Sequence, residues 1–167
     1  MKTKKNISFI GMPAVGKSTV GNLLTQKIDF AFLDSDDLIQ SREHQTLAQI
    51  ISSKGRSRFL EIEEQHILSI DCSHHVIATG GSVIYSPKAM AHLSRISTIL
   101  YLFVDLKTLL TRLSDITARG VAIDEGKSIE DLYKERTPLY DKYHDIKIDC
   151  TSMTAEQVAE RVMAYLS

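Results

Sequence analysis

The feature that most constrains the fold is a glycine-rich motif near the start of the chain, GMPAVGKST at Gly11–Thr19. It directly follows a short apolar run at residues 7–10, which is typical of a buried strand. Glycine at the first and sixth positions lets backbone N–H groups turn inward around phosphate oxygens, where a side chain would intrude. A helix that begins at the end of the motif directs its positive end at the same anion. The order strand, loop, helix therefore predicts a P-loop that binds a nucleotide.

The polar residues of this loop have predicted contacts of their own. Lys17 is placed to reach the β- and γ-phosphates, and the hydroxyl of Ser18 is placed to bind Mg²⁺. A strand-to-helix turn without a ligand is the alternative, but it does not account for the Lys-Ser pair. The loop residues expected to bind the nucleotide are Gly11, Ala14, Val15, Gly16, Lys17, Ser18 and Thr19.

The composition of the chain limits what is attached to this loop. Its 167 residues are 43% apolar and 25% charged with a formal net charge of −1, which indicates one globular domain over 1–167. This balance argues against a nucleic-acid or anionic-membrane surface, because either normally carries a basic excess. The two cysteines, Cys72 and Cys150, lack the spacing of a zinc site. We expect a cytoplasmic, monomeric enzyme without nucleic-acid or membrane partners.

Apolar runs alternate with helical patterns along the chain. Runs that are rich in β-branched residues predict strands near 6–10, 30–33, 75–79, 98–104 and 145–149. This alternation is typical of a parallel sheet with helices on both faces, a three-layer α/β/α fold that gathers ligands at the carboxyl ends of its strands. The P-loop, Asp34–Asp36 and Thr79–Ser82 follow three of these strands. We therefore expect them to meet at one edge of the sheet.

The segment 115–127, DITARGVAIDEGK, combines weak periodicity with two glycines and mixed charge. These features are typical of a mobile surface loop, and we expect a lid. Phosphoryl transfer benefits when water is excluded and a positive side chain approaches the transferring group, a role that suits Arg119. A solvated connection in which Arg119 has no function is the alternative.

Five segments together resemble the shikimate kinase family: the P-loop, FLDSDDLI at 32–39, KGRSRFLEIEE at 54–64, ATGGSVI at 78–84 and LYKERTPLY at 132–140. Their order and spacing match that family over nearly the whole chain. The resemblance implies a P-loop kinase fold with sheet order 2-3-1-4-5 and a substrate-binding helical segment at about 36–70. It also implies transfer of the γ-phosphoryl group of ATP, with Mg²⁺, to a ring hydroxyl of shikimate, in the pathway to chorismate and the aromatic amino acids.

The resemblance assigns roles to two carboxylates after the second strand. Asp34 resembles the carboxylate on the Mg²⁺ side, together with Ser18. Asp36 resembles the carboxylate that holds the substrate hydroxyl and accepts its proton as the oxygen attacks. The alternative is that Asp36 or Asp37 caps the following helix. The implied catalytic residues are Lys17, Asp36 and Arg119.

A glycine turn and an arginine complete the implied substrate site. Gly80 and Gly81 resemble the first two residues of the family's Gly-Gly-Gly turn, whose backbone approaches the substrate closely, but Ser82 stands at the third position. Arg136 matches the arginine that binds the substrate carboxylate, for which a planar guanidinium is a natural bidentate partner.

Two further arginines resemble residues on the nucleotide side. Arg112 and Arg119 have the spacing of the family's adenine-stacking arginine and lid arginine. The family's lid continues Pro-Leu-Leu after its arginine, whereas this chain has Gly120-Val121-Ala122. The shape of the closed lid is therefore expected to differ.

The largest departure lies in the segment 55–63, where Leu60 replaces a second arginine that binds the substrate carboxylate in the family. Arg56, one helical turn earlier, is placed to supply the missing guanidinium to shikimate. Alternatively, Glu63 faces the pocket without its partner, which would suit a zwitterion such as homoserine. A third possibility is that Glu63 pairs with Arg56 or Arg58 at the surface. The residues expected to bind the substrate are Asp36, Arg56, Phe59, Glu63, Gly80, Gly81, Ser82 and Arg136.

A nucleotide-dependent switch or binding module that has lost catalysis is a third class of function. Asp36 and Arg136 argue against it, because they have a purpose in a substrate pocket and none in a switch. A shikimate kinase is therefore the leading prediction. A kinase of the same fold for another small hydroxylated acid or amino acid comes second.

Overall fold

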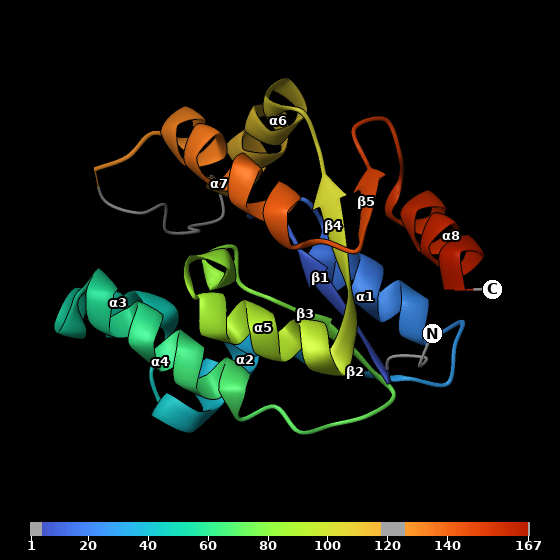
Figure 1. Cartoon of the computed structure of the whole chain (residues 1–167). Coiled ribbons are helices and arrows are strands. Elements are labelled where there is room, and N and C mark those ends of the chain that lie inside the picture. The colour runs from blue at the N-terminus through green and yellow to red at the C-terminus, as the bar shows by residue number, and fades with distance from the viewer. Residues whose placement is uncertain (1–4, 118–125, 167) are drawn as a thin grey trace.

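The computed structural model describes residues 5–117 and 126–166, and strands alternate with helices along the chain (Figure 1). The strands are β1 (Asn6–Ile10), β2 (Ala31–Asp34), β3 (His75–Ala78), β4 (Ser97–Phe103) and β5 (Ile146–Asp149). The helices are α1 (Lys17–Thr25), α2 (Ser35–Glu43), α3 (Leu47–Lys54), α4 (Arg56–Leu68), α5 (Pro87–Ile96), α6 (Leu106–Thr117), α7 (Ile129–Tyr143) and α8 (Ala155–Leu166). A short 3-10 turn, η1 (Val83–Tyr85), precedes α5.

The strands form one parallel sheet in the order β2-β3-β1-β4-β5. This arrangement confirms the predicted α/β fold and the order implied by the family resemblance. The central strand β1 is buried along its whole length, because helices cover both faces of a parallel sheet. Each predicted strand lies within one or two residues of an observed one.

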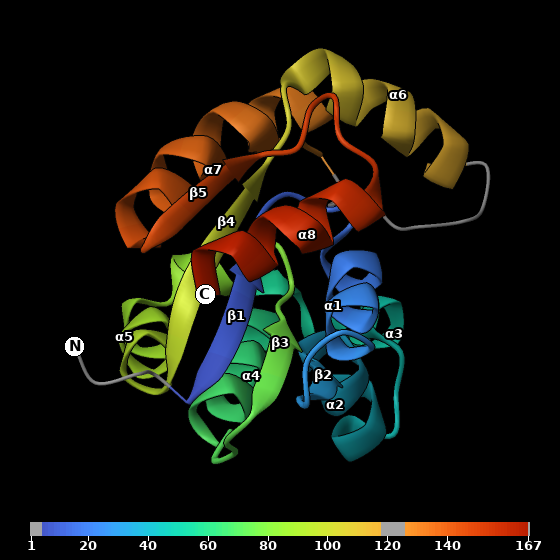
Figure 2. The same cartoon turned by 90° about the vertical axis from the view of Figure 1, so that its right-hand side faces the viewer.

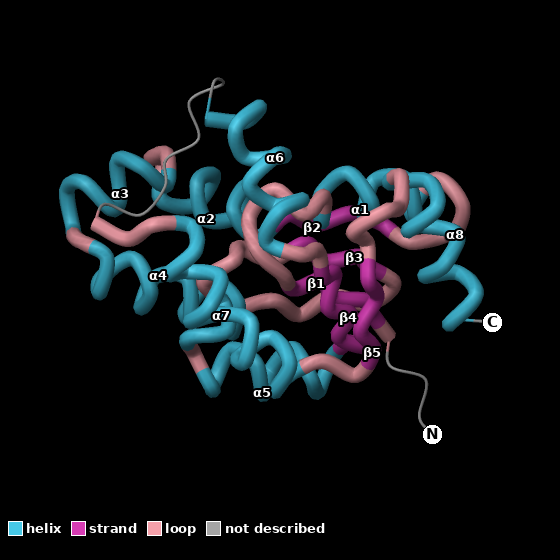
Figure 3. The backbone as a smooth tube through the Cα atoms, turned by 90° about the horizontal axis from the view of Figure 1, so that it is seen from above, coloured by secondary structure: helices cyan, strands magenta, loops and turns pink. Residues whose placement is uncertain are grey.

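Helices α1 and α8 pack together on one face of the sheet, and α5 and α7 cover the other (Figures 2 and 3). The segment expected to bind the substrate, about 36–70, forms most of α2, α3 and α4. Figure 3 shows these three helices gathered to one side of the strands. None of the helices in the described ranges combines the length and apolar character needed to cross a bilayer.

Two local expectations are wrong. The side chain of Asp34 caps α2 by accepting a hydrogen bond from the backbone N–H of Asp36 at 2.9 Å, so Asp36 and Asp37 lie in the first turn and are not the cap. The expected lid, 115–127, begins too early, because residues 115–117 end helix α6. Residues 118–125, including Arg119, lie outside the described residues.

Candidate active site

The P-loop needs glycine at positions 11 and 16. Gly16 has a φ of 98° and forms the N-cap of α1, a left-handed conformation that glycine adopts readily. A Cβ on Gly11 would lie only 2.6 Å from the carbonyl oxygen of Leu102 on β4. The loop therefore passes so close to the sheet that any side chain at Gly11 would displace it.

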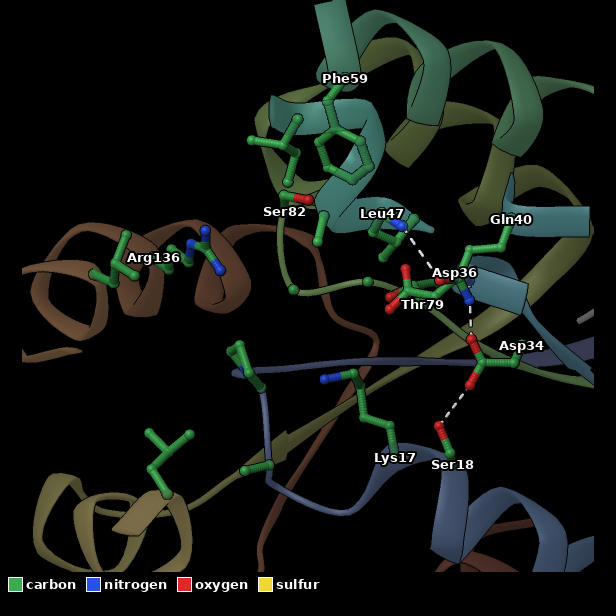
Figure 4. Close-up of a pocket in the computed structure, with 18 of the residues that line it drawn as sticks. Lys17, Ser18, Asp34, Asp36, Gln40, Leu47, Phe59, Thr79, Ser82 and Arg136 are labelled. Carbon is green, nitrogen blue, oxygen red and sulfur yellow. Dashed lines mark hydrogen bonds between the residues drawn. The ribbon is translucent and has the colours of Figure 1, made fainter. Parts of the chain in front are cut away.

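Lys17 is held inside this loop. Its side-chain Nζ donates hydrogen bonds to the carbonyl oxygens of Gly11 and Met12, both at 2.8 Å. Burial lowers the pKa of Lys17 to about 8, and the charges of Asp36 and Asp34 partly oppose this shift. The ammonium group thus lies in a buried setting close to two carboxylates (Figure 4).

Asp34 links the P-loop to the start of α2. Its Oδ2 accepts a hydrogen bond from the hydroxyl of Ser18 at 2.6 Å, while Oδ1 caps α2 through the Asp36 N–H (Figure 4). Mg²⁺ prefers oxygen ligands and usually keeps waters and substrate phosphates as the rest of its shell. A hydroxyl and a carboxylate oxygen side by side at the P-loop fit that requirement.

Two carboxylates converge on Gly80, at the end of β3. A Cβ at this position would lie 2.8 Å from Oδ1 of Asp36 and 2.7 Å from Oε1 of Glu63. Burial raises the pKa of Asp36 to about 6, with a further contribution from Asp34 and opposition from Lys17. Glycine is therefore required at 80 to let both carboxyl groups approach the backbone.

Glu63 lies inside the protein and not at its surface. Its side chain is 3% exposed, and its two carboxylate oxygens accept hydrogen bonds from the Ser82 hydroxyl at 2.8 and 3.0 Å. Burial raises the pKa of Glu63 to about 7, which the Ser82 hydrogen bond partly opposes. The surface ion pair considered above is therefore wrong, and Arg58 pairs with Glu61 instead.

Arg136 is 4% exposed and reaches the site from α7. Its Nε donates to the Tyr85 hydroxyl at 3.2 Å, and its guanidinium carbon lies 5.4 Å from the centroid of that ring. The guanidinium carbon of Arg56 lies 5.3 Å from the same centroid. Leu60, by contrast, packs against an apolar cluster under α4. Arg56 therefore joins Arg136 at Tyr85, while Leu60 contributes to packing.

Neighbouring residues that the sequence did not single out hold these groups in place. The Tyr140 hydroxyl donates to the carbonyl oxygen of Gly81 at 2.6 Å, and the Ser35 hydroxyl accepts from the N–H of Gly80 at 3.1 Å. Tyr85 contacts Arg136 as described. Tyr140 lies one helical turn after Arg136, and this spacing places both side chains on one face of α7. The spacing could therefore have identified Tyr140 as a residue of the site.

A cavity of about 640 Å³ joins the P-loop to α2, α4, the glycine turn and α7 (Figure 4). Of the residues predicted for the site, it is lined by Ala14, Gly16, Lys17, Ser18, Thr19, Asp34, Asp36, Phe59, Gly80, Gly81, Ser82 and Arg136. Among the described residues, the predicted ones that do not line it are Gly11, Val15, Arg56, Glu63 and Arg112.

Arg112 belongs to a neighbouring cavity of about 270 Å³ on the other side of the P-loop. Its guanidinium donates to the carbonyl oxygens of Val15 at 3.2 Å and Cys150 at 3.3 Å. Val15, Gly16 and Thr19 line the same cavity. Arg112 therefore lies beside the P-loop, in a different cavity from the one that Asp34 and Asp36 line.

The chain resembles known proteins over almost its entire length. Residues 13–167 match the shikimate kinase family model. A shikimate kinase from Thermodesulfovibrio yellowstonii is 36% identical over 95% of this chain and 93% of its own length. The threonine synthase-like 1 protein of Homo sapiens is 34% identical over 95% of this chain, which spans 22% of that protein.

Among solved structures, a shikimate kinase from Acinetobacter baumannii in complex with shikimate superposes with a TM-score of 0.87 at 26% identity. The match covers 99% of this chain and 94% of that one. The sequence matches extend beyond the P-loop to the segments that supply Asp36, Glu63 and Arg136. The chain therefore belongs to the shikimate kinase family.

Proposed function

We propose that this chain transfers the γ-phosphoryl group of ATP to a ring hydroxyl of shikimate, in the pathway to chorismate and the aromatic amino acids. The observation that carries the proposal is a single cavity lined by Lys17, Asp36 and Arg136. These residues supply a phosphate-binding cation, a carboxylate for a hydroxyl and a guanidinium for a carboxylate. A shikimate kinase that is 36% identical to this chain supports the same acceptor.

On the nucleotide side, the backbone N–H groups of the P-loop and the N-terminus of α1 would bind the phosphates. Lys17 would turn from the loop carbonyls that it now contacts toward the β- and γ-phosphates. Arg112, beside Val15, would flank the adenine. Ser18 and Asp34 would hold Mg²⁺, Asp34 through a water molecule, and that ion supplies charge neutralisation on the phosphates.

On the acceptor side, Asp36 would orient the reacting hydroxyl and take its proton. The substrate oxygen forms a bond to the γ-phosphorus as the bond from that phosphorus to the β,γ-bridging oxygen breaks, which leaves ADP. Because the pKa of Asp36 is about 6, this carboxylate is largely ionised at neutral pH and is still basic enough to accept a proton. Catalysis then rests on positioning and on neutralisation of charge.

The substrate carboxylate would lie on Arg136, and Arg56, which packs on the same Tyr85 ring, would supply a second guanidinium. Phe59 would pack against the ring of the substrate, because it lines the cavity and is mostly buried. We assign Arg119 to the phosphates in a closed lid that follows α6, as the family resemblance implies.

A coupled ADP-release assay with ATP, Mg²⁺ and shikimate tests this function. Homoserine belongs in the same panel, because Leu60 replaces an arginine and Glu63 lies beside the substrate pocket. Saturable turnover of shikimate is expected. Turnover of homoserine alone would reassign the acceptor, and ATP binding without any turnover would favour a non-catalytic nucleotide-binding module.

The proposal includes a monomer that works in the cytoplasm without nucleic-acid or membrane partners. The formal net charge of −1 supports this view, because surfaces for nucleic acid or anionic lipid normally carry a basic excess. Light scattering coupled to size-exclusion chromatography tests the oligomeric state, for which a mass near 18.7 kDa is expected.

A further inference from the structure

Ser82 has a hydrogen-bonding role that its position in the glycine turn does not require. Its hydroxyl lies 2.8 and 3.0 Å from the two oxygens of Glu63 and donates to them. An ionised carboxylate can only accept hydrogen bonds, and a serine hydroxyl has one hydrogen to give. Since Glu63 is 3% exposed, this hydrogen bond compensates part of the cost of its burial. While Glu63 is ionised, the hydrogen of Ser82 is therefore committed to it.

Ser82 also borders the substrate cavity. Ser82 lines this cavity together with Asp36 and Arg136 (Figure 4). With its hydrogen directed to Glu63, its oxygen offers only lone pairs to a ligand. Ser82 thus presents an acceptor that is fixed in direction, because Glu63 is buried and anchors the hydroxyl.

The Ser82 hydroxyl and Asp36, which would hold the reacting hydroxyl, belong to the same part of the site. Oδ1 of Asp36 and Oε1 of Glu63 both lie within 2.8 Å of the point that a Cβ on Gly80 would occupy. The carboxylate that binds Ser82 and the carboxylate of Asp36 therefore flank the same backbone position, and Ser82 and Asp36 line one cavity. Two acceptors in one cavity suit the neighbouring hydroxyls of a polyhydroxylated ring. Arg136 is the donor nearby and suits the carboxylate instead.

We propose that Ser82 determines substrate specificity by accepting a hydrogen bond from a ring hydroxyl next to the one that is phosphorylated. This inference rests on the proposed function and adds a second hydroxyl contact to the same site. A site built to pair with a substrate hydroxyl discriminates strongly against an analogue without it, because its polar groups are then left unpaired. Ser82 and Glu63 together give this chain that discrimination.

The test compares shikimate with two analogues, each lacking one of the ring hydroxyls that is not phosphorylated. We would measure kcat/KM for all three compounds with the natural protein and with Ser82→Ala, at pH 8, above the pKa of Glu63. In the natural protein, removal of the contacted hydroxyl should lower kcat/KM about tenfold, the size of one hydrogen bond. In Ser82→Ala the same removal should cost less than about twofold.

A purely structural role for Ser82 would give a different result, because it would slow all three compounds alike and leave their ratios unchanged. Ser86→Ala is the matched control: Ser86 also donates to a glutamate of α4, Glu64, at 2.6 Å, and is not among the described residues that line the cavity. In Ser86→Ala, the ratios of kcat/KM between shikimate and the two analogues should equal those of the natural protein. Ser82→Gly serves as a second variant should the alanine protein fail to fold.

Unchanged ratios in an active Ser82→Ala or Ser82→Gly enzyme would overturn the proposal. So would a natural protein that uses both analogues as well as it uses shikimate. Either outcome leaves the proposed function intact, because shikimate is still phosphorylated. A natural protein that does not phosphorylate shikimate would instead overturn the proposed function, and the role of Ser82 with it.

Discussion

Replacement of Gly80 by alanine tests whether the two carboxylates must meet at the end of β3. The new methyl group would lie 2.7 Å from Oε1 of Glu63 and 2.8 Å from Oδ1 of Asp36, whereas an ordinary contact begins at 3.4 Å. Both carboxyl groups must therefore retreat by about 0.7 Å, and misplacement on this scale can cost about a hundredfold in rate. We expect kcat to fall about a hundredfold, or about 2.7 kcal/mol in barrier height.

The assay measures kcat by coupled ADP release, ATP affinity by calorimetry and the melting temperature. ATP binding should stay within about twofold, because the atoms nearest to a Cβ on Gly80 belong to Glu63 and Asp36. Overpacking should cost about 1–3 kcal/mol of stability. Gly55→Ala is the contrasting control: a Cβ there meets no atom within 4 Å, but φ is 81°. Because ψ is 162°, this backbone conformation is nearly exclusive to glycine, so the variant should lose about 1–3 kcal/mol of stability and keep kcat. Full kcat in Gly80→Ala would show that Asp36 and Glu63 do not need to approach the backbone at position 80.

Three further predictions concern the acceptor side of the site. Asp36→Asn should lower kcat at least a hundredfold and leave calorimetric ATP affinity nearly unchanged, since a general base contributes about 10²–10⁴-fold; a fully active variant would show that another group takes the proton. Arg136→Ala should raise the KM for shikimate at least tenfold with a smaller effect on kcat, and an unchanged KM would mean that the carboxylate is bound elsewhere. Glu63 has its pKa raised from 4.5 to about 7, so between these pH values the folded chain holds a proton that the unfolded chain has lost, and stability falls as pH rises. Relative to Glu63→Gln, the natural protein should lose about 3 kcal/mol of unfolding free energy across this range in denaturant titrations, and parallel pH profiles would contradict the assignment.

The fold could be predicted from the sequence wherever the signal is local. The strand before Gly11 and the four later strands are short apolar runs rich in β-branched residues, and all five lie within one or two residues of the observed elements. The order of the sheet is not a local property. It followed from the family resemblance, because alternation of strands and helices permits several orders.

The site was predictable in its residues but less so in its contacts. Asp34 caps α2 because its backbone is extended, with φ −99° and ψ 123°, and that conformation is not written in the run Asp34-Ser35-Asp36-Asp37. Glu63 is buried against Ser82 because α4 packs on the turn η1, a contact between segments distant in sequence. Tyr85 was missed for the same reason, because its partners Arg56 and Arg136 come from two other helices.

We propose that the cavity between the P-loop and Arg136 is the site where shikimate is phosphorylated. The most direct measurement is ADP release by the natural protein with ATP, Mg²⁺ and either shikimate or homoserine, with Lys17→Ala as the inactive control. We expect saturable turnover of shikimate, with KM between about 1 μM and 1 mM, and little or none with homoserine. Turnover of homoserine without turnover of shikimate, or no turnover at all, would contradict this proposal.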